Sequence, residues 1–138
     1  MAINYLGVIL AAFASMIVGF LWYSKMIFGK QWARFKGYTK ETLKKAQAGM
    51  GKLYGLSFVM TLLMAYVLAH VMILSNSFYG YGMLQTGITS AIFMWLGFIM
   101  PVQFTNQIFG EKKWGLFFID TGYQLISLLA MGIVISLF

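Results

Sequence analysis

The chain has 138 residues, of which 61% are apolar, 18% aromatic and only 9% charged, and its net charge is +7. A soluble domain carries about 25% charged residues, so this composition excludes an ordinary soluble domain, and the aromatic content excludes a disordered chain. The sequence contains no cysteine, one histidine (His70) and three acidic residues. These counts argue against thiolate or multi-histidine metal sites and leave little for paired-carboxylate chemistry. We therefore predict an integral membrane protein with no metal and no cofactor.

Four apolar stretches are long enough to cross a membrane as helices, which requires about 20 residues each. Helices are expected because an open sheet would leave backbone groups unpaired in lipid, and because the stretches do not alternate as barrel strands do. None of the four contains lysine or arginine. We predict an all-α bundle of four transmembrane helices, forming a single membrane domain over residues 1–138, with spans near residues 4–24, 53–75, 84–108 and 114–137.

The positive charges predict an orientation. Eight of the ten Lys and Arg residues lie between Lys25 and Lys52, the other two are Lys112 and Lys113, and the 76–83 connection carries no charge. Both basic connections fall on the same side of a four-span protein, and basic connections stay in the cytoplasm. We therefore predict a multi-pass protein of the cytoplasmic (inner) membrane with both termini outside.

The first basic connection, residues 25–52, is predicted to contain a segment that lies on the membrane surface. Residues 29–36 mix aromatics with cations and stop before Gly37, and Thr39 is the expected N-cap of a helix through Leu43 and Ala46. A solvated basic loop is the alternative, and nucleic-acid binding is not needed to explain these cations. The residues expected at the lipid interface are Trp32, Arg34, Phe35, Lys36 and, before the last span, Trp114.

Two segments of the chain have similar sequences and are called here the echo segments. Residues 27–32 (IFGKQW) follow the first span, and residues 108–114 (IFGEKKW) follow the third. Each lies at the cytoplasmic end of a helix that runs inward. The echo therefore suggests two helical hairpins in parallel orientation, related by a pseudo-twofold axis along the membrane normal. Chance similarity between aromatic-rich interfacial segments is the alternative.

The opening of the chain contains residues 19–24 (GFLWYS), followed by Phe28, Gly29, Trp32 and Gly37. These residues match the pattern G-x-LWYS … FG-x-x-W … G, and the opening therefore resembles that of a membrane family catalogued as domain of unknown function 1761. Residues 95–98 (WLGF) and 119–123 (IDTGY) are similar to its second half. The resemblance covers nearly the whole chain. It implies a small four-helix membrane protein of prokaryotic type, and it implies no activity.

Asp120 is the only acidic residue within a predicted span. It lies six residues into the fourth span, so about 9 Å along the helix from the cytoplasmic end. An acid at that depth is costly unless it faces the bundle interior, water or a cation. Asp120, Gln124 and Ser127 follow i, i+4, i+7 spacing and share one face.

We expect a polar pocket open to the cytoplasm, in which Asp120 binds a cation or proton or anchors a polar substrate. The end of the first span, with Tyr23 and Ser24, is expected to reach the same region. In the alternative interpretation, Asp120 pairs with a lysine or caps its own helix and only locks the helices together. The expected pocket residues are Asp120, Gln124, Tyr123, Ser127, Gln103, Asn106, Gln107, Tyr54, Ser57, Thr61 and Lys25.

Three further features are interpreted mainly as structural. His70, one turn from Tyr66, is expected to be a satisfied interfacial residue rather than a proton relay or metal ligand. Pro101 is expected to kink the third span and to free a backbone carbonyl. Small residues at four-residue spacing are expected to pack helices within the chain, with a homodimer face as the alternative. These are Ala11, Ser15 and Gly19 in the first span, and Ala65 and Ala69 in the second.

The leading functional prediction is a small oligomeric transporter or channel-like protein for a small solute or ion, with its site around Asp120. An oligomer is expected because a bundle of 138 residues encloses little volume. The alternative is an accessory or scaffold subunit that packs against a larger membrane partner or lipid. A membrane enzyme using Asp120 or His70 for acid–base chemistry ranks last, because the sequence shows no catalytic set. The chain is therefore expected not to be an enzyme.

Overall fold

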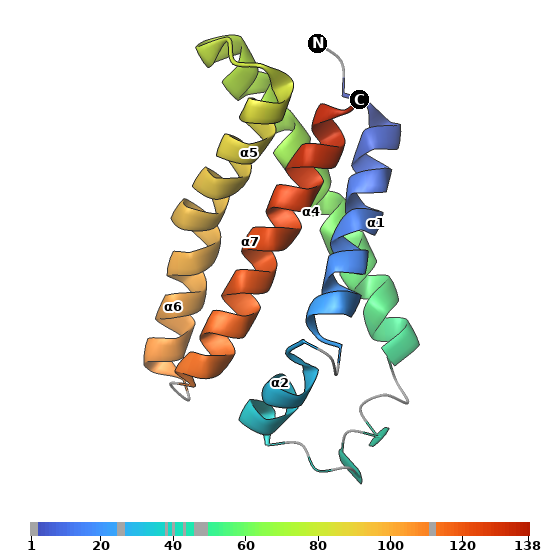
Figure 1. Cartoon of the computed structure of the whole chain (residues 1–138), viewed down its shortest axis with the longest axis vertical. Coiled ribbons are helices and arrows are strands. Elements are labelled where there is room, and N and C mark those ends of the chain that lie inside the picture. Colours follow the sequence, from blue (N-terminus) through green and yellow to red (C-terminus); the bar gives the residue numbers. More distant parts are fainter. Residues whose placement is uncertain are drawn as a thin grey trace.

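The computed structural model describes residues 3–24, 27–37, 39, 41–42, 44–45, 50–110 and 113–138, and those residues contain helices and no strand. The helices are α1 (Tyr5–Trp22), α2 (Gly29–Lys36), α4 (Met50–Tyr79), α5 (Met83–Met94), η1 (Trp95–Ile99), α6 (Met100–Phe109) and α7 (Trp114–Ser136). Figure 1 shows α1, α4, α7 and the continuous α5–η1–α6 rod as a four-rod bundle. α2 lies beneath one end, called here the α2 end, and both chain termini lie at the other.

Four helices are long and apolar enough to cross a membrane, as the sequence predicts: residues 5–22, 51–79, 83–109 and 114–136. The second is longer than expected, because it continues to Tyr79 instead of stopping near residue 75. Residues 75–79 contain no glycine or proline, and Gly80 then adopts a φ of 73° and donates its N–H to the Asn76 carbonyl at 2.8 Å. The predicted 76–83 connection therefore shortens to residues 80–82.

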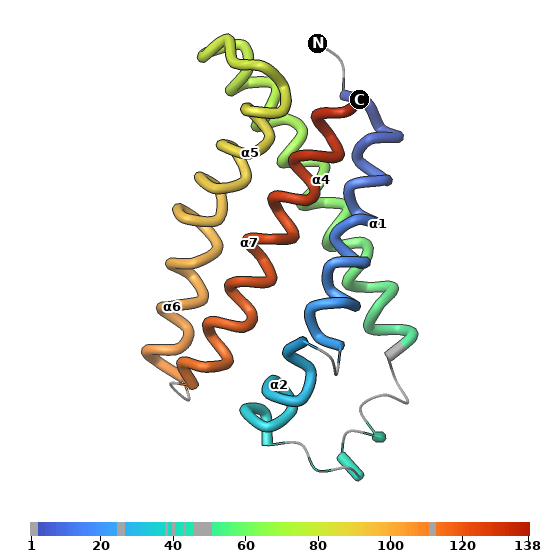
Figure 2. Tube along the Cα trace, viewed as in Figure 1, coloured from blue at the N-terminus to red at the C-terminus, as the bar shows by residue number. Residues whose placement is uncertain are grey.

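α7 is the central helix and packs against α1, α4, α5 and α6 (Figure 2). The core between these helices is apolar, and Leu68, Met72 and Met131 are its largest fully buried apolar side chains. A close approach of two helices joins Gly87 of α5 to Gly132 of α7. A Cβ added to either glycine would lie 2.5 Å from the backbone carbonyl oxygen of the other, so the two backbones are in direct contact.

The small residues predicted to pack helices do so within the chain. Ala11 and Ser15 of α1 are buried, as are Ala65 and Ala69 of α4. Gly19 lies beneath the Tyr123 side chain, since an added Cβ would be 3.1 Å from the phenol oxygen. Both four-residue stripes are thus occupied by neighbouring helices of the same chain, as the intrachain interpretation predicts.

The third long helix accommodates Pro101 through a π-helical turn, η1, between α5 and α6. Proline lacks an N–H, so the Gly97 carbonyl four residues earlier has no α-helical donor. The helix is wider just before this point, where the Met100 N–H donates a hydrogen bond to the Trp95 carbonyl five residues earlier. The sequence indicates a disturbance at Pro101, whereas the π turn itself is a finding of the structure.

The interfacial segment predicted at residues 29–36 forms α2 and ends at Gly37, whose φ of 75° suits glycine. Beyond it, the Thr39 hydroxyl accepts the Thr42 N–H at 3.2 Å, while the Thr39 N–H donates to the Thr42 hydroxyl at 2.7 Å. These reciprocal bonds match the predicted N-cap. The rest of that predicted helix, including Leu43 and Ala46, lies outside the described residues.

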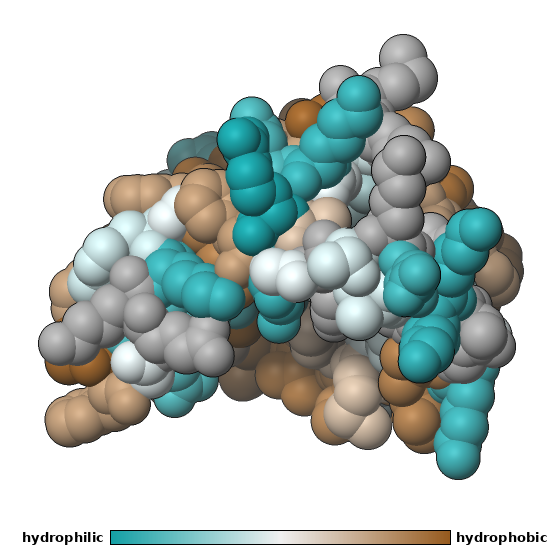
Figure 3. Space-filling view, turned by 90° about the horizontal axis from the view of Figure 1, so that it is seen from below, coloured by the Kyte–Doolittle hydropathy of each residue, from teal (hydrophilic) through white to brown (hydrophobic). Residues whose placement is uncertain are grey.

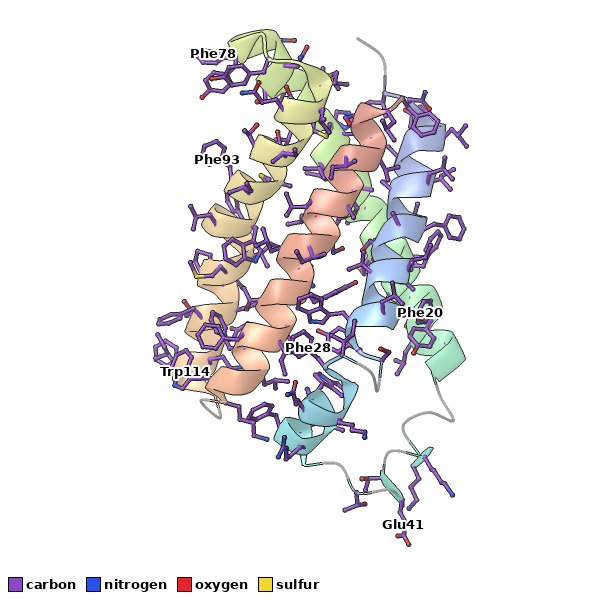
Figure 4. The ribbon with its side chains drawn as sticks, in the orientation of Figure 1. Phe20, Phe28, Glu41, Phe78, Phe93 and Trp114 are labelled. Atoms are coloured by element: carbon purple, nitrogen blue, oxygen red, sulfur yellow. The ribbon has the colours of Figure 1, made fainter. Side chains whose placement is uncertain are left out.

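The two echo segments have different local structures. The first leads into α2, and its Phe28 packs on Trp22 of α1 with ring centroids 4.8 Å apart (Figure 4). The second begins inside α6, where Phe109 is 86% exposed, and the chain then enters α7 at Trp114. The sequence similarity between the segments therefore does not extend to their surroundings.

α2 docks on the first turn of α7 through Phe35, whose ring lies directly over Gly115. A Cβ on Gly115 would meet the Phe35 ring at 2.1 Å. We expect Gly115→Leu to displace α2, so that trypsin cleaves at least about tenfold faster after Arg34 and Lys36, because locally opened segments are cut preferentially. The rate is read by mass spectrometry of the protein in detergent.

Gly51→Leu serves as the control, since nothing lies within 4 Å of a Cβ added at that position. Its cleavage after Arg34 and Lys36 should stay at the wild-type rate. Equal cleavage of the wild type and Gly115→Leu would contradict the docking of α2 on α7.

Candidate functional site

The centre of the candidate site is a contact between Asp120 of α7 and Tyr23, the residue that follows α1. The Tyr23 phenol donates a hydrogen bond to Asp120 Oδ1 at 2.5 Å, and both side chains are partly buried. Burial, followed by the hydrogen bond to Asp120 and its negative charge, raises the pKa of the Tyr23 phenol above its ordinary value. The phenol therefore stays protonated and acts as the donor. The structure therefore brings the end of the first predicted span next to Asp120.

Two indole groups hold α7 on either side of Asp120. Trp22 of α1 donates its Nε1–H to the Ile119 carbonyl at 2.9 Å. Trp95 of η1 donates its Nε1–H to the Thr121 carbonyl at 2.8 Å. Neither tryptophan is among the site residues predicted from the sequence. Their signal was available, because an indole N–H inside an apolar helix requires an acceptor from a neighbouring element.

Tyr123 and Ser127 extend the polar contacts from Asp120 along the α1–α7 interface. The Tyr123 ring packs edge-on against Tyr23, with centroids 5.3 Å apart, and its phenol donates to the Ser15 carbonyl at 3.4 Å. One helical turn farther, the hydroxyls of Ser15 and Ser127 form a buried hydrogen bond with each other. Ser127, which is predicted to share a face with Asp120 and Gln124, thus lies with Tyr123 at the α1–α7 interface, and α1 supplies the opposite wall.

The predicted amides of the third helix lie beside α7 but make separate contacts. Gln103 Oε1 accepts the Thr121 hydroxyl at 2.7 Å. Gln107 Oε1 accepts the Lys113 backbone N–H at 2.9 Å, at the junction of α6 and α7. Asn106 is exposed and Gln124 is half-buried. Gln103 and Gln107 therefore join α6 to α7 through hydrogen bonds, and neither is seen to contribute to a binding site at Asp120.

The structure does not bring the predicted α4 residues to Asp120. Tyr54 packs against Phe20 of α1 with ring centroids 5.2 Å apart, and Ser57 is exposed. The buried Thr61 hydroxyl donates to the Ser57 carbonyl within its own helix at 2.8 Å. The prediction of a shared pocket was wrong here because α4 packs chiefly on α1 and α5, and α1 separates it from α7 near the α2 end (Figure 1). Lys25, also predicted for the pocket, lies outside the described residues.

A polar pocket opens at the α2 end, one turn of α7 before Asp120. Its volume is about 320 Å³, and its lining residues are Lys36, Gln107, Lys113 and Leu116. Leu116 precedes Asp120 by four residues and so shares its face of α7. Of these lining residues, only Gln107 is predicted from the sequence to line a pocket.

The residues predicted for a lipid interface gather at the same end. Figure 3 looks onto this end and shows hydrophilic side chains spread over it, with apolar ones around the sides. The Lys36 ammonium lies 5.7 Å from the Trp32 ring centroid, a cation–π distance, and Arg34 is exposed. Trp114 is 39% exposed and packs on Phe104 with centroids 5.2 Å apart (Figure 4).

His70 bonds within its own helix. Its Nδ1 lies 2.9 Å from the Tyr66 carbonyl oxygen, and its ring packs edge-on against the Tyr66 ring at 4.4 Å. This environment is the satisfied one that the sequence analysis preferred. Among the described residues, no group of three His, Cys, Asp or Glu side chains gathers as metal ligands would.

The fold and the site define a class of protein: an all-α chain with four helices long and apolar enough to span a membrane. An acid–phenol contact joins the residue that follows the first of these helices to the last helix. The chain belongs to the family described as Protein of unknown function (DUF1761), whose model matches residues 6–136. This result confirms the resemblance found in the opening motif. Searches of curated proteins and of solved structures each found no match to the chain.

Proposed function

We propose that the chain is a multi-pass protein of the cytoplasmic membrane whose α2 end faces the cytoplasm. The support is the charge distribution, since eight of ten cations lie between Lys25 and Lys52 and the other two precede α7. In this setting α1 with α4, and the α5–η1–α6 rod with α7, are two hairpins of parallel orientation, as the sequence echo suggests. Both termini then lie outside.

We propose that this protein transports a small ion or a small polar solute and that Asp120 is its binding carboxylate. The observation that supports this function is the hydrogen bond of 2.5 Å between Tyr23 and Asp120. Asp120 is the only acid in the four long helices, and charged groups at that depth are costly unless they serve a pathway or a partner. A cationic group entering from the α2 end replaces the Tyr23 phenol as the partner of the carboxylate.

The transporting unit in this proposal is a homo-oligomer. Leu68, Met72 and Met131 fill the middle of the bundle, and the buried hydrogen bond between two serine hydroxyls lies at the α1–α7 interface. A path between protomers would have to run beside that interface. Native mass spectrometry from nanodiscs measures the number of copies.

The test is uptake into proteoliposomes, with rubidium ion as the probe in one arm and proton flux, read by an internal pH dye, in the other. We expect Asp120→Asn to lower the rate at least about tenfold, because the binding group loses its charge. Glu41→Gln is the matched control, since Glu41 is an exposed acid outside the long helices. Transport by Asp120→Asn at the wild-type rate in both arms would overturn the role of Asp120.

The second candidate function is an accessory or scaffold subunit for a larger membrane partner. One observation favours it: the polar groups around Asp120 are paired within the chain, through Tyr23, Trp22 and Trp95. The same pairing is expected if Asp120 only joins the helices and binds no ligand. This function predicts a stable co-purifying complex, together with no uptake by the isolated protein in either arm of the proteoliposome assay.

A further inference from the structure

The pocket at the α2 end is built from three different elements. Lys36 is the last residue of α2, Gln107 lies in the last turn of α6, and Lys113 directly precedes α7, where Leu116 adds an apolar wall. Phe35 holds α2 against Gly115 beside it. The two lysines therefore face a common space because of how the helices dock, although they are 77 positions apart in the sequence.

The lining side chains offer hydrogen-bond donors to a ligand. Each lysine carries an ammonium group with three donors and no acceptor. Gln107 uses its Oε1 to accept the Lys113 backbone N–H at 2.9 Å, so its remaining polar group is the NH₂ donor. Leu116 supplies no polar atom. Two positive charges and an amide donor around one space match a ligand that carries negative charge on several acceptor oxygens.

We propose that this pocket binds a phosphate group. Phosphate presents several oxygens that accept charge-assisted hydrogen bonds from lysine and amide donors, and basic pockets between membrane helices hold lipid headgroups in this way. The volume of about 320 Å³ accommodates a phosphate with its ester substituent. The phosphate belongs either to a phospholipid headgroup, with Leu116 against the glycerol region, or to free inorganic phosphate. This proposal does not depend on transport by Asp120.

The experiment measures ligand retention by the full chain in mild detergent, using native mass spectrometry. Phosphatidylglycerol is the lipid probe, diacylglycerol is the same lipid without phosphate, and inorganic phosphate is the soluble probe. We expect one tightly retained phosphatidylglycerol and weak retention of diacylglycerol. Lys36→Gln and Lys113→Gln should each weaken phosphatidylglycerol binding about tenfold, because each removes a charge-assisted contact.

Lys30→Gln and Lys52→Gln are the matched controls. Both lysines are exposed. The two substitutions remove the same charge as the pocket variants do, from α2 and from the start of α4, at positions outside the pocket lining. They should change the affinity less than about twofold, as exposed charges do. Asp120→Asn should bind phosphatidylglycerol at least as well as the wild type, so loss of transport and loss of phosphate binding are distinguishable.

The retention of the three probes distinguishes a lipid headgroup from free phosphate and from the absence of a phosphate site. If phosphatidylglycerol alone is retained and depends on Lys36 and Lys113, the ligand is a lipid headgroup. If inorganic phosphate binds with the same dependence and displaces the lipid, the source is the soluble anion. Equal retention of diacylglycerol and phosphatidylglycerol, or equal losses in the pocket and control variants, would overturn the phosphate site.

Discussion

Gly132→Ala is expected to destabilise the protein by about 3 kcal/mol, the upper end of overpacking effects, and to lower Tm by roughly 10 °C. The added Cβ would lie 2.5 Å from the Gly87 carbonyl oxygen, and that atom belongs to the backbone of α5. A flexible side chain would rotate away from such a contact, whereas a helix must shift as a whole. Thermal unfolding followed by circular dichroism in mild detergent measures the change.

Gly55→Ala provides the control, because nothing lies within 4 Å of a Cβ added at that position of α4. The same chemical change there should stabilise the helix by about 0.5–1 kcal/mol, since glycine costs conformational entropy in a helix. Gly87→Ala should behave as Gly132→Ala does. If Gly132→Ala melts at or above the temperature of Gly55→Ala, α5 and α7 are not in backbone contact.

The number and approximate positions of the long helices could be predicted, because apolar runs and their charged or glycine boundaries are visible in the sequence. Gly37 ends α2 as expected. The faces of these helices could not be predicted in the same way. A helix that is apolar on all sides carries no hydropathy signal to say which side meets a neighbour. The Gly87–Gly132 contact therefore emerged only from the structure.

The same distinction explains the outcome for the candidate site. Asp120 could be singled out because it is the only acid in the long helices, and Tyr23 because the chain places it at the same depth. Depth alone also suggested Tyr54, which lies on α4 and packs on α1 instead. Predicting a site in a bundle requires the order of the helices around the axis, and spacing within one helix does not supply it. The indole bonds of Trp22 and Trp95 depend on that same order.

The hydrogen bond between Tyr23 and Asp120 is expected to stabilise the fold as a coupled pair. Tyr23→Phe should destabilise by about 2 kcal/mol, because it leaves a partly buried carboxylate without its donor. The double variant Tyr23→Phe with Asp120→Asn should cost little more than Tyr23→Phe alone. The resulting coupling energy, roughly 1.5–3 kcal/mol, is obtained from a double-mutant cycle of unfolding measurements in detergent.

Tyr54→Phe is the matched control for this cycle, since that exposed tyrosine contacts its neighbour through its ring. Its stability should remain within about 0.5 kcal/mol of the wild type. A coupling energy near zero would mean that the phenol and the carboxylate do not interact in the folded protein.

The coupling energy and the uptake measurements together distinguish the two candidate functions. A large coupling energy, combined with loss of uptake in the single variant Asp120→Asn, would indicate that the Tyr23 phenol occupies the binding carboxylate until a cationic group replaces it. If coupling is large and no variant changes transport, the pair serves to join α1 to α7, and the accessory function gains its strongest support.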